Sequence, residues 1–201
     1  MITILDGSMG SELARRGAGS ATGLWSAKAL LDAPDMVVQV HRDYIAAGAK
    51  VITTNSYSTV PSYLEKEGLA DRYEELTHLA GELARRAVKE SGEDVRVAGS
   101  LPPLSESYRP DLIPDAAESL PVYAGMVGAM RDNVDLFLCE TMSSGAEAAH
   151  AVSQASAHGL GKPVMVSWTL NEEPGNGLRS GDSVADAFAK LQDFELAAYL
   201  F

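Results

Sequence analysis

Four short apolar runs in this chain each end abruptly in polar, reactive side chains. Segments with helical patterning lie between the runs, as expected for parallel strands that alternate with helices. Strands connected in this way bring their carboxyl ends to one side of a sheet or barrel, where active sites are assembled. The runs are Ile2–Leu5 before Asp6-Gly7-Ser8, Val51–Ile52 before Thr53-Thr54-Asn55-Ser56, Val95–Ala98 before Gly99-Ser100, and Val134–Leu138 before Cys139-Glu140-Thr141.

Apolar periodicity along the whole chain predicts six strands separated by helices. Strand-to-strand distances of roughly 30 to 50 residues are typical of βαβ units with right-handed crossovers. Asp32 is a candidate cap for the helix that begins at Pro34, and Ser143-Ser144 cap a later helix. The predicted strands are 2–5, 50–54, 95–99, 134–139, 163–168 and 195–201; the predicted helices are 8–16, 34–48, 69–90, 115–130, 143–158 and 182–191, with 24–31, 102–114 and 171–181 as loops or turns.

Two α/β architectures fit this element order. One is an open doubly wound sheet, but no G-x-G-x-x-G follows the first strand, so the dinucleotide-binding fingerprint is missing. The other is a (β/α)8 TIM-barrel type of which only about six βα units are present, because a full barrel usually needs about 250 residues. The chain has 201 residues and its last six form an apolar strand. We therefore expect one domain over residues 1–201 that is incomplete at its C-terminus.

Composition narrows the classes of partner. A net charge of −12 disfavours nucleic acid and anionic membranes, since both attract clustered Lys and Arg. The only cysteine is Cys139, which leaves no internal disulfide and suits a reducing, cytoplasmic location. No basic leader and no apolar run of membrane-spanning length is seen. Small molecules or another protein chain are the expected partners.

The polar residues at the strand ends have both functional and structural interpretations. Asp6 can accept an ammonium group or act as a base, and Gly7 lets a ligand carboxylate reach backbone N–H groups; the alternative is a helix-capping turn. Thr54 and Asn55 can line a polar pocket or form a polar turn. Glu140 is costly to bury without a cation, which favours an anchor for an amino group or a salt bridge with Arg109 or Arg179.

Other reactive side chains are assigned structural roles. Cys139 is expected to be a small buried hydrophobe rather than a nucleophile. The four histidines all fall in helical segments without a second ligand at metal spacing, so we expect ordinary surface or packing residues. Trp25 and Trp168 are expected to pack in the core. The histidines are His41, His78, His150 and His158.

Taken together, these segments resemble the homocysteine S-methyltransferase family. The resemblance keeps the family order and spans essentially the whole chain, and several motifs in register make it more specific than any one of them. The matching stretches are Leu5–Leu13 (LDGSMGSEL), Leu24–Ser26 (LWS), His41–Tyr57 (HRDYIAAGAKVITTNSY), Ala98–Ser100 (AGS), Cys139–Thr141 (CET) and Leu178–Asp182 (LRSGD).

The resemblance implies a barrel enzyme that moves a methyl group onto the sulfur of homocysteine and so makes methionine. Asp6 and Gly7 would hold the polar end of the amino acid, Thr54 and Asn55 would line the pocket, and Glu140, with Thr141 beside it, would take the ammonium. A free thiol is mostly protonated at neutral pH. The family uses zinc held by three cysteines, so that the coordinated thiol deprotonates. The donor would be a sulfonium, a betaine-type compound or a folate.

The chain departs from the family pattern in two places. The family's zinc cysteines lie just beyond the sixth strand and at the eighth, whereas this chain ends at Phe201, and Cys139 is not one of those ligands. Leu101–Pro110 replaces a glycine-rich loop of many relatives, which leaves the donor open. We therefore expect a fragment with impaired activity and no zinc ligands of its own. Its exposed strand edges would be covered by self-association into a homo-oligomer.

Two further functions stay open at this point. One is a non-catalytic, amino-acid-binding or self-associating barrel remnant. The other is a metal-free lyase or isomerase that uses Glu140 as its base.

Overall fold

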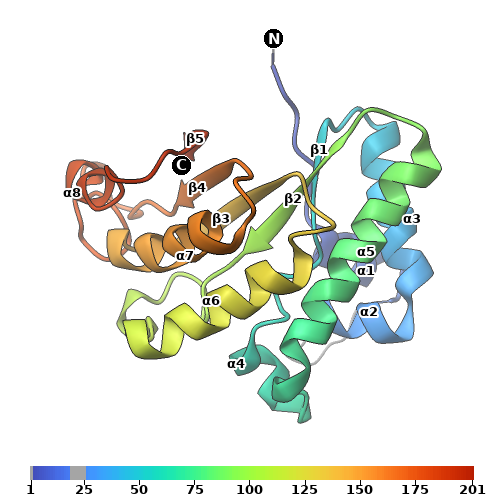
Figure 1. Ribbon diagram of the computed structural model, residues 1–201, viewed down its shortest axis with the longest axis horizontal. Helices are drawn as coiled ribbons and strands as arrows, with labels where there is room; N and C mark the ends of the chain where they lie inside the picture. The colour runs from blue at the N-terminus through green and yellow to red at the C-terminus, as the bar shows by residue number, and fades with distance from the viewer. Residues whose placement is uncertain (1, 19–25) are drawn as a thin grey trace. The chain divides into compact units, whose positions relative to one another are not determined.

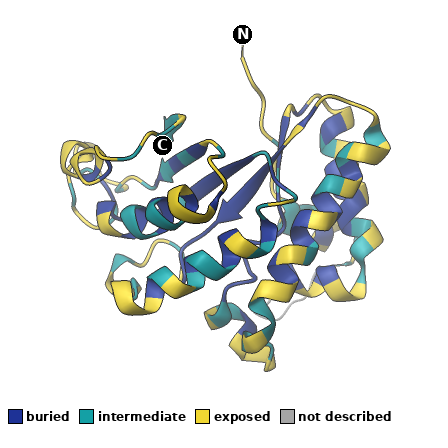
Figure 2. Ribbon diagram, in the orientation of Figure 1, coloured by how far each residue is buried: buried dark blue, intermediate teal, exposed yellow. Residues whose placement is uncertain are grey.

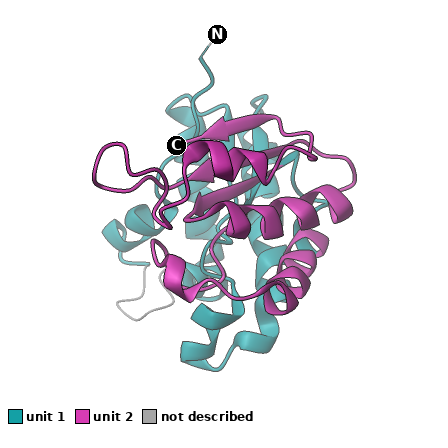
Figure 3. Cartoon of the chain, turned by 90° about the vertical axis from the view of Figure 1, so that its left-hand side faces the viewer, with its two compact units in different colours: residues 1–100, 129–136 teal, residues 101–128, 137–201 magenta. Residues whose placement is uncertain are grey.

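The computed structural model describes residues 2–18 and 26–201. The chain divides into two compact units, which Figure 3 shows in different colours. Unit 1 comprises residues 1–100 and 129–136, and unit 2 comprises residues 101–128 and 137–201. Each unit contains parallel strands and helices, as the βα pattern of the sequence predicts. The expectation of one domain over residues 1–201 stays a prediction.

Unit 1 is built around strands β1 (Val51–Thr53) and β2 (Arg96–Leu101). They pair in parallel, with Val51 opposite Arg96 and Thr53 opposite Ala98. The prediction of a buried first strand at residues 2–5 is wrong, because only Leu5 forms a bridge, to Val51, and Ile2 is 90% exposed. Backbone hydrogen bonds tie this segment to the β1 side alone, which leaves its apolar side chains in solvent.

The helices of unit 1 begin and end at residues whose conformation favours a helix terminus. Ser8 caps the first helix by accepting a hydrogen bond from the Ser11 N–H, and Gly92 ends the longest helix with a φ of 71°. They are α1 (Met9–Arg15), α2 (Ala27–Asp32), α3 (Pro34–Ala46), α4 (Pro61–Leu64), η1 (Glu65–Glu67), η2 (Ala70–Arg72) and α5 (Tyr73–Ser91), with labels in Figure 1.

Three sequence predictions in this unit need correction. Residues 27–32 form a helix instead of a loop, and Asp32 is the last residue of that helix. The cap position of α3 is Ala33, whose side chain cannot accept a hydrogen bond, so the helix start depends on Pro34 at its first position. The helix predicted from residue 69 starts at Tyr73, after the short turn η2.

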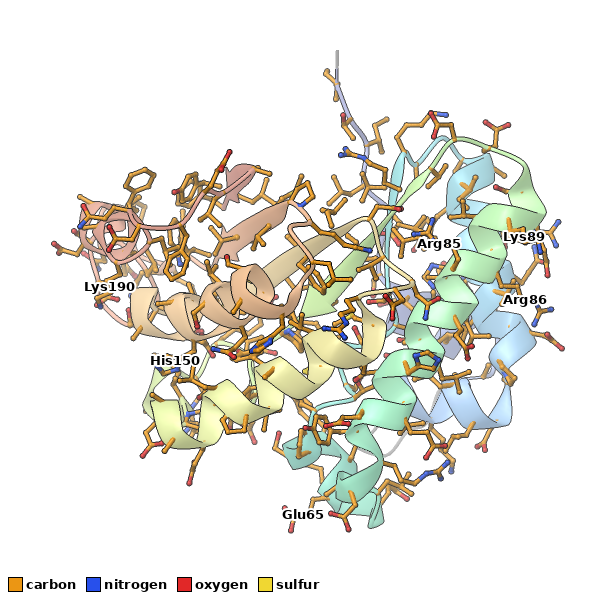
Figure 4. All side chains as sticks on the ribbon, in the orientation of Figure 1. Glu65, Arg85, Arg86, Lys89, His150 and Lys190 are labelled. Carbon is orange, nitrogen blue, oxygen red and sulfur yellow. The ribbon has the colours of Figure 1, made fainter. Side chains whose placement is uncertain are left out.

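The apolar faces of α1, α2, α3 and α5 form the main core of unit 1. α3 and α5 lie side by side, and Figure 2 shows buried residues along the faces that they turn toward each other. Exposed charged residues occupy the outer face of α5, where Figure 4 labels Arg86 and Lys89. The core residues are Leu13, Ala27, Ala29, Leu30, Val37, Val38, Val40, Leu64, Leu76, Ala80, Leu83 and Ala87.

Unit 2 contains strands β3 (Leu136–Met142), β4 (Val164–Trp168) and β5 (Ala198–Leu200). β4 pairs in parallel with β3 and with β5. β3 continues three residues beyond its predicted end, so Glu140 and Thr141 lie inside the strand instead of after it. A register shift between Cys139 and Met142 interrupts the pairing with β4 at this point. The predicted sixth strand, 195–201, is limited to three residues.

The helices of unit 2 follow the predicted pattern closely. α6 continues through Pro121 although proline removes one backbone hydrogen bond, as predicted. The Ser144 hydroxyl caps α7 by accepting from the Glu147 N–H. No helix in the described parts of the chain is long and apolar enough to cross a membrane. The elements are η3 (Pro110–Leu112), α6 (Ala116–Met130), α7 (Gly145–His158) and α8 (Val184–Ala189).

Candidate functional site

Asp6 is held at the carboxyl end of β1 by three hydrogen bonds. Its backbone N–H donates to the Val51 carbonyl over 3.0 Å. Its carboxylate accepts from the Thr53 N–H over 2.8 Å and from the Thr53 hydroxyl over 3.0 Å. The side chain is only 6% exposed, and burial raises its pKa from 3.8 to about 6 although the bonds from Thr53 oppose this rise. Asp6 is thus a fixed, poorly hydrated carboxylate with a strong electrostatic preference for a cation.

Gly7 lies directly against Tyr44 of α3. A Cβ at position 7 would be 2.8 Å from the Tyr44 hydroxyl oxygen and 3.0 Å from the ring. The Tyr44 hydroxyl in turn donates to the Ser8 carbonyl over 3.3 Å. The absence of a side chain at Gly7 therefore lets α3 support the turn that carries Asp6, and it also leaves the exposed Gly7 backbone uncovered.

Thr54 and Asn55 are buried at the end of β1 and make hydrogen bonds within unit 1. The Thr54 hydroxyl oxygen lies 2.8 Å from the Ser56 hydroxyl oxygen and accepts from the Ser100 N–H over 3.0 Å. The Asn55 amide donates to the Ser26 carbonyl over 2.9 Å. These bonds fix the strand ends of β1 and β2, which is the framework that a pocket wall needs. The role of Thr54 and Asn55 in ligand binding stays a prediction.

Glu140 and Thr141 lie at the bulge in β3 of unit 2. Thr141 has a φ of 61°, an unusual conformation for a β-branched residue. Both residues are partly buried. A bulge re-aims side chains, and strained backbone of this kind is concentrated at functional sites. The two residues therefore have the local geometry of a binding position, and their contact with a ligand stays a prediction.

Arg109 and Arg179, the loop arginines named as possible partners of Glu140, form ion pairs with other acidic residues. Arg109 pairs with Asp111 over 2.7 Å, and Arg179 pairs with Glu172 over 3.1 Å. The Arg179 guanidinium also lies 4.9 Å from the centre of the Tyr108 ring. Both arginines thus have acidic partners within unit 2.

Cys139 and Trp168 occupy the packing roles predicted for them. Cys139 is fully buried, and burial raises the pKa of its thiol far above the ordinary range, so it is not a thiolate nucleophile. Trp168 is 2% exposed and its ring stacks on Tyr199 with 5.8 Å between centroids. Trp25 and Leu24 lie outside the described residues.

The described residues do not fit a thiolate-type metal centre. No group of three or more His, Cys, Asp or Glu side chains in residues 2–18 and 26–201 is arranged to hold a metal ion. The single cysteine is sealed inside β3. A metal bound by several cysteines would need ligands other than these.

Two residues beside Asp6 were not among the predicted site residues. Thr53 was grouped with the polar strand end, yet its backbone N–H and its hydroxyl both donate to the Asp6 carboxylate. His41 was treated as an ordinary helical residue, yet it is fully buried behind Asp6. Its spacing of four from Val37 and from Ile45 places it on the apolar stripe of α3 and was the available signal.

Acidic and hydroxyl side chains at the carboxyl ends of parallel strands are typical of α/β proteins with a binding or active site at that end. A sequence profile of the homocysteine S-methyltransferase family matches residues 3–201. The chain belongs to this family, which confirms the resemblance inferred from its motifs.

Individual relatives agree with this assignment. The chain is 30% identical over 207 residues to homocysteine S-methyltransferase of Escherichia coli, with coverage of 96% of this chain and 66% of the relative. It is 28% identical over 217 residues to homocysteine S-methyltransferase YbgG of Bacillus subtilis, with coverage of 99% and 68%. The chain thus spans about two thirds of the length of these curated relatives.

Solved structures confirm the predicted fold class. The metallated form of the homocysteine methyltransferase MmuM from Escherichia coli matches with a TM-score of 0.87 at 30% identity. The match covers 98% of this chain and 73% of that one. The (β/α)8 TIM-barrel type predicted from the sequence is therefore the fold class of this chain.

Proposed function

We propose that this chain is the amino-acid-binding part of a homocysteine S-methyltransferase. The reaction would transfer a methyl group from a sulfonium or related donor to the homocysteine thiol and give methionine. The proposal depends on one observation: in a chain of this family, Thr53 holds the buried carboxylate of Asp6 at the end of a strand. Such a carboxylate binds an ammonium group with little competition from water.

Six residues would bind the amino acid. The ammonium would be taken by Asp6 and Glu140, and the carboxylate by backbone N–H groups exposed beside Gly7. Thr141 would support Glu140 from the same bulge, and Thr54 and Asn55 would form the polar wall beside Asp6.

The sulfur chemistry would need a group that this part of the chain does not provide. Zinc, when bound, would lower the pKa of the homocysteine thiol and so generate the attacking thiolate. The described residues contain no fitting ligand set, so we assign no step to them beyond binding and orienting the amino acid. We accordingly propose weak or absent turnover by these 201 residues, in a cytoplasmic protein without nucleic-acid or membrane partners.

Binding and turnover should be measured separately. Calorimetric titration with L-homocysteine should show binding that is weakened in Asp6→Asn and in Glu140→Gln. Asp111→Asn, an exposed acid in η3, serves as the control and should bind like the original chain. Absence of homocysteine binding by the original chain would refute the proposal.

Methionine formation should be followed by mass spectrometry with zinc, homocysteine and either S-methylmethionine or S-adenosylmethionine. We expect little methionine above the protein-free control. Fast, zinc-dependent turnover would keep the family function but would refute the proposal of weak or absent turnover.

A non-catalytic, amino-acid-binding or self-associating protein is the second candidate. It is favoured by the absence of a metal ligand set in the described residues. Retained homocysteine binding with no turnover, even when full-length relatives are active in the same assay, would support it.

A further inference from the structure

His41 is a fully buried histidine that has no hydrogen-bond partner in the described part of the chain. It lies in α3 with an exposed fraction of 0%. Neither Nδ1 nor Nε2 has a partner within hydrogen-bond distance. A neutral imidazole always carries one N–H, and leaving that donor unsatisfied in the interior is unfavourable. An orphaned group of this kind calls for an explanation.

The nearest acid is the one proposed to bind the ammonium group. His41 Nδ1 lies 4.0 Å from Asp6 Oδ2. This separation exceeds a hydrogen bond of about 2.7–3.2 Å, so roughly 1 Å of movement would make the contact. Thr53 already holds the Asp6 carboxylate through two hydrogen bonds. His41 therefore faces a carboxylate whose position is fixed.

The surroundings of His41 keep its ring neutral. The buried side chains that α1, α2, α5 and β1 contribute among the described residues carry no ionisable group. Burial lowers the pKa of His41 from 6.5 to about 4. Tyr44 is the other titratable group near Asp6; burial raises its pKa, and the charges of Glu12 and Asp6 add to this rise while Arg16 and Arg15 oppose it. His41 therefore offers an N–H dipole to Asp6 and not a positive charge.

We propose that His41 is a positioning residue that donates its Nδ1–H to Asp6 Oδ2 when an amino acid binds. The hydrogen bond would stabilise the ionised carboxylate and direct its free lone pairs toward the ammonium group. It would also satisfy the buried N–H. This role rests on the proposed function, because it requires Asp6 to bind the ammonium.

Two substitutions separate positioning from packing. His41→Asn places an amide N–H near the position of Nδ1, whereas His41→Leu fills a similar volume without a donor. A positioning role predicts that His41→Leu weakens L-homocysteine binding about ten-fold, as expected for one hydrogen bond to a charged group. His41→Asn should stay within about three-fold of the original chain on the same scale. A packing role predicts the opposite order, because leucine suits an apolar site and asparagine does not.

A ligand-free measurement keeps this inference separate from the proposed function. The Asp6 carboxyl carbon should be titrated by NMR in each variant. We expect a small rise of the Asp6 midpoint in His41→Leu, because the imidazole dipole 4.0 Å from the carboxylate is lost even before the hydrogen bond forms, and a return toward the original value in His41→Asn. Unchanged binding and an unchanged Asp6 midpoint in His41→Leu would overturn the inference. Failure of the original chain to bind homocysteine would refute the proposed function, whereas the Asp6 titration would still test the pair.

The imidazole tautomer gives a readout that needs no variant to fold. Nitrogen NMR of the original chain should show the Nδ1–H form and a change at Nδ1 when homocysteine is added. A proton on Nε2 in the bound state would refute the proposed hydrogen bond.

Discussion

At the scale of single residues, burial makes Glu147 a source of pH-dependent stability. Glu147 is 4% exposed and accepts a hydrogen bond from the Ser143 N–H over 2.7 Å. Burial raises its pKa from 4.5 to about 7, against the opposing effect of that bond. A raised carboxyl pKa means that the folded state favours the protonated form. Glu147 therefore contributes stability that is present below pH 4.5 and lost as the pH rises through about 7.

The substitution Glu147→Gln should remove this loss, because glutamine stays neutral and can still accept from Ser143. We expect the variant to match the original chain in acid and to exceed it by up to about 3 kcal/mol in free energy of unfolding at mildly alkaline pH. Urea unfolding across this pH range measures the difference. Glu118→Gln, an exposed first-turn acid in α6, is the matched control. Parallel pH curves for Glu147→Gln and the original chain would contradict the prediction.

The left-handed backbone conformation of Thr141 is expected to lower the stability of the fold by a measurable amount. A left-handed conformation costs an L-residue about 1–2 kcal/mol, and asparagine tolerates it better than threonine. Thr141→Asn should therefore raise the free energy of unfolding by about 0.5–1 kcal/mol. If the bulge serves ligand binding, homocysteine affinity should fall in the same variant. Thr169→Asn, in the loop after β4, is the control for loss of the threonine methyl group.

The two measurements on Thr141→Asn have separate meanings. Lower stability would show that the bulge does not strain this residue. Higher stability with unchanged affinity would remove Thr141 from the proposed binding residues while leaving the strain argument intact.

At the scale of elements, two helical glycines give opposite predictions. A Cβ at Gly145, the first residue of α7, would lie 2.8 Å from the Ala187 Cα and 2.9 Å from the Lys190 Cδ. Gly145→Ala should separate α7 from α8 and cost about 1–3 kcal/mol. Gly128 in α6 has nothing within 4 Å of such a Cβ. Gly128→Ala should gain about 0.5–1 kcal/mol, because alanine favours the helix. Thermal and urea unfolding measure both changes, and a loss of stability in Gly128→Ala would contradict the helix argument.

The element order was predictable from the sequence, because periodicity and caps are local signals. Ser8, Pro34, Ser144 and Gly92 mark helix ends that the structure confirms. The exposed segment 2–5 was not predictable, since an apolar run indicates a strand but not whether neighbours cover it. The bulge at Thr141 was also hidden, because register depends on the partner strand.

The candidate site was predictable only in part. The strand-end pattern and the family motifs identified Asp6 and Glu140 as acids of interest. The fixed geometry of Asp6 depends on Thr53, and its buried neighbour His41 lies in a helix 35 positions away; no local pattern connects either residue to Asp6. Burial of a polar side chain arises from tertiary packing, so its pKa and its partners become visible only in the fold.

At the scale of the whole molecule, an exposed apolar strand edge and a large net charge have opposite effects on self-association. β5 pairs with β4 on one side, and aromatic rings gather around it in unit 2. Phe188 and Phe201 are 47% and 64% exposed, and the Phe188 ring lies 4.6 Å from that of Tyr199. Exposed apolar surface beside an edge strand favours self-association. The net charge of −12 opposes the approach of two copies.

We therefore expect self-association that strengthens with salt. The screening length falls from about 30 Å at 0.01 M to about 8 Å at 0.15 M ionic strength, which weakens the repulsion between copies but leaves apolar contacts intact. Sedimentation velocity should show a larger species as salt and protein concentration increase. The double substitution Phe188→Ser and Phe201→Ser should abolish the increase, whereas Leu112→Ser, which alters an apolar residue that is 39% exposed in η3, should leave it unchanged. Association that salt weakens, or that survives loss of both rings, would show that charged contacts or another surface bring the copies together.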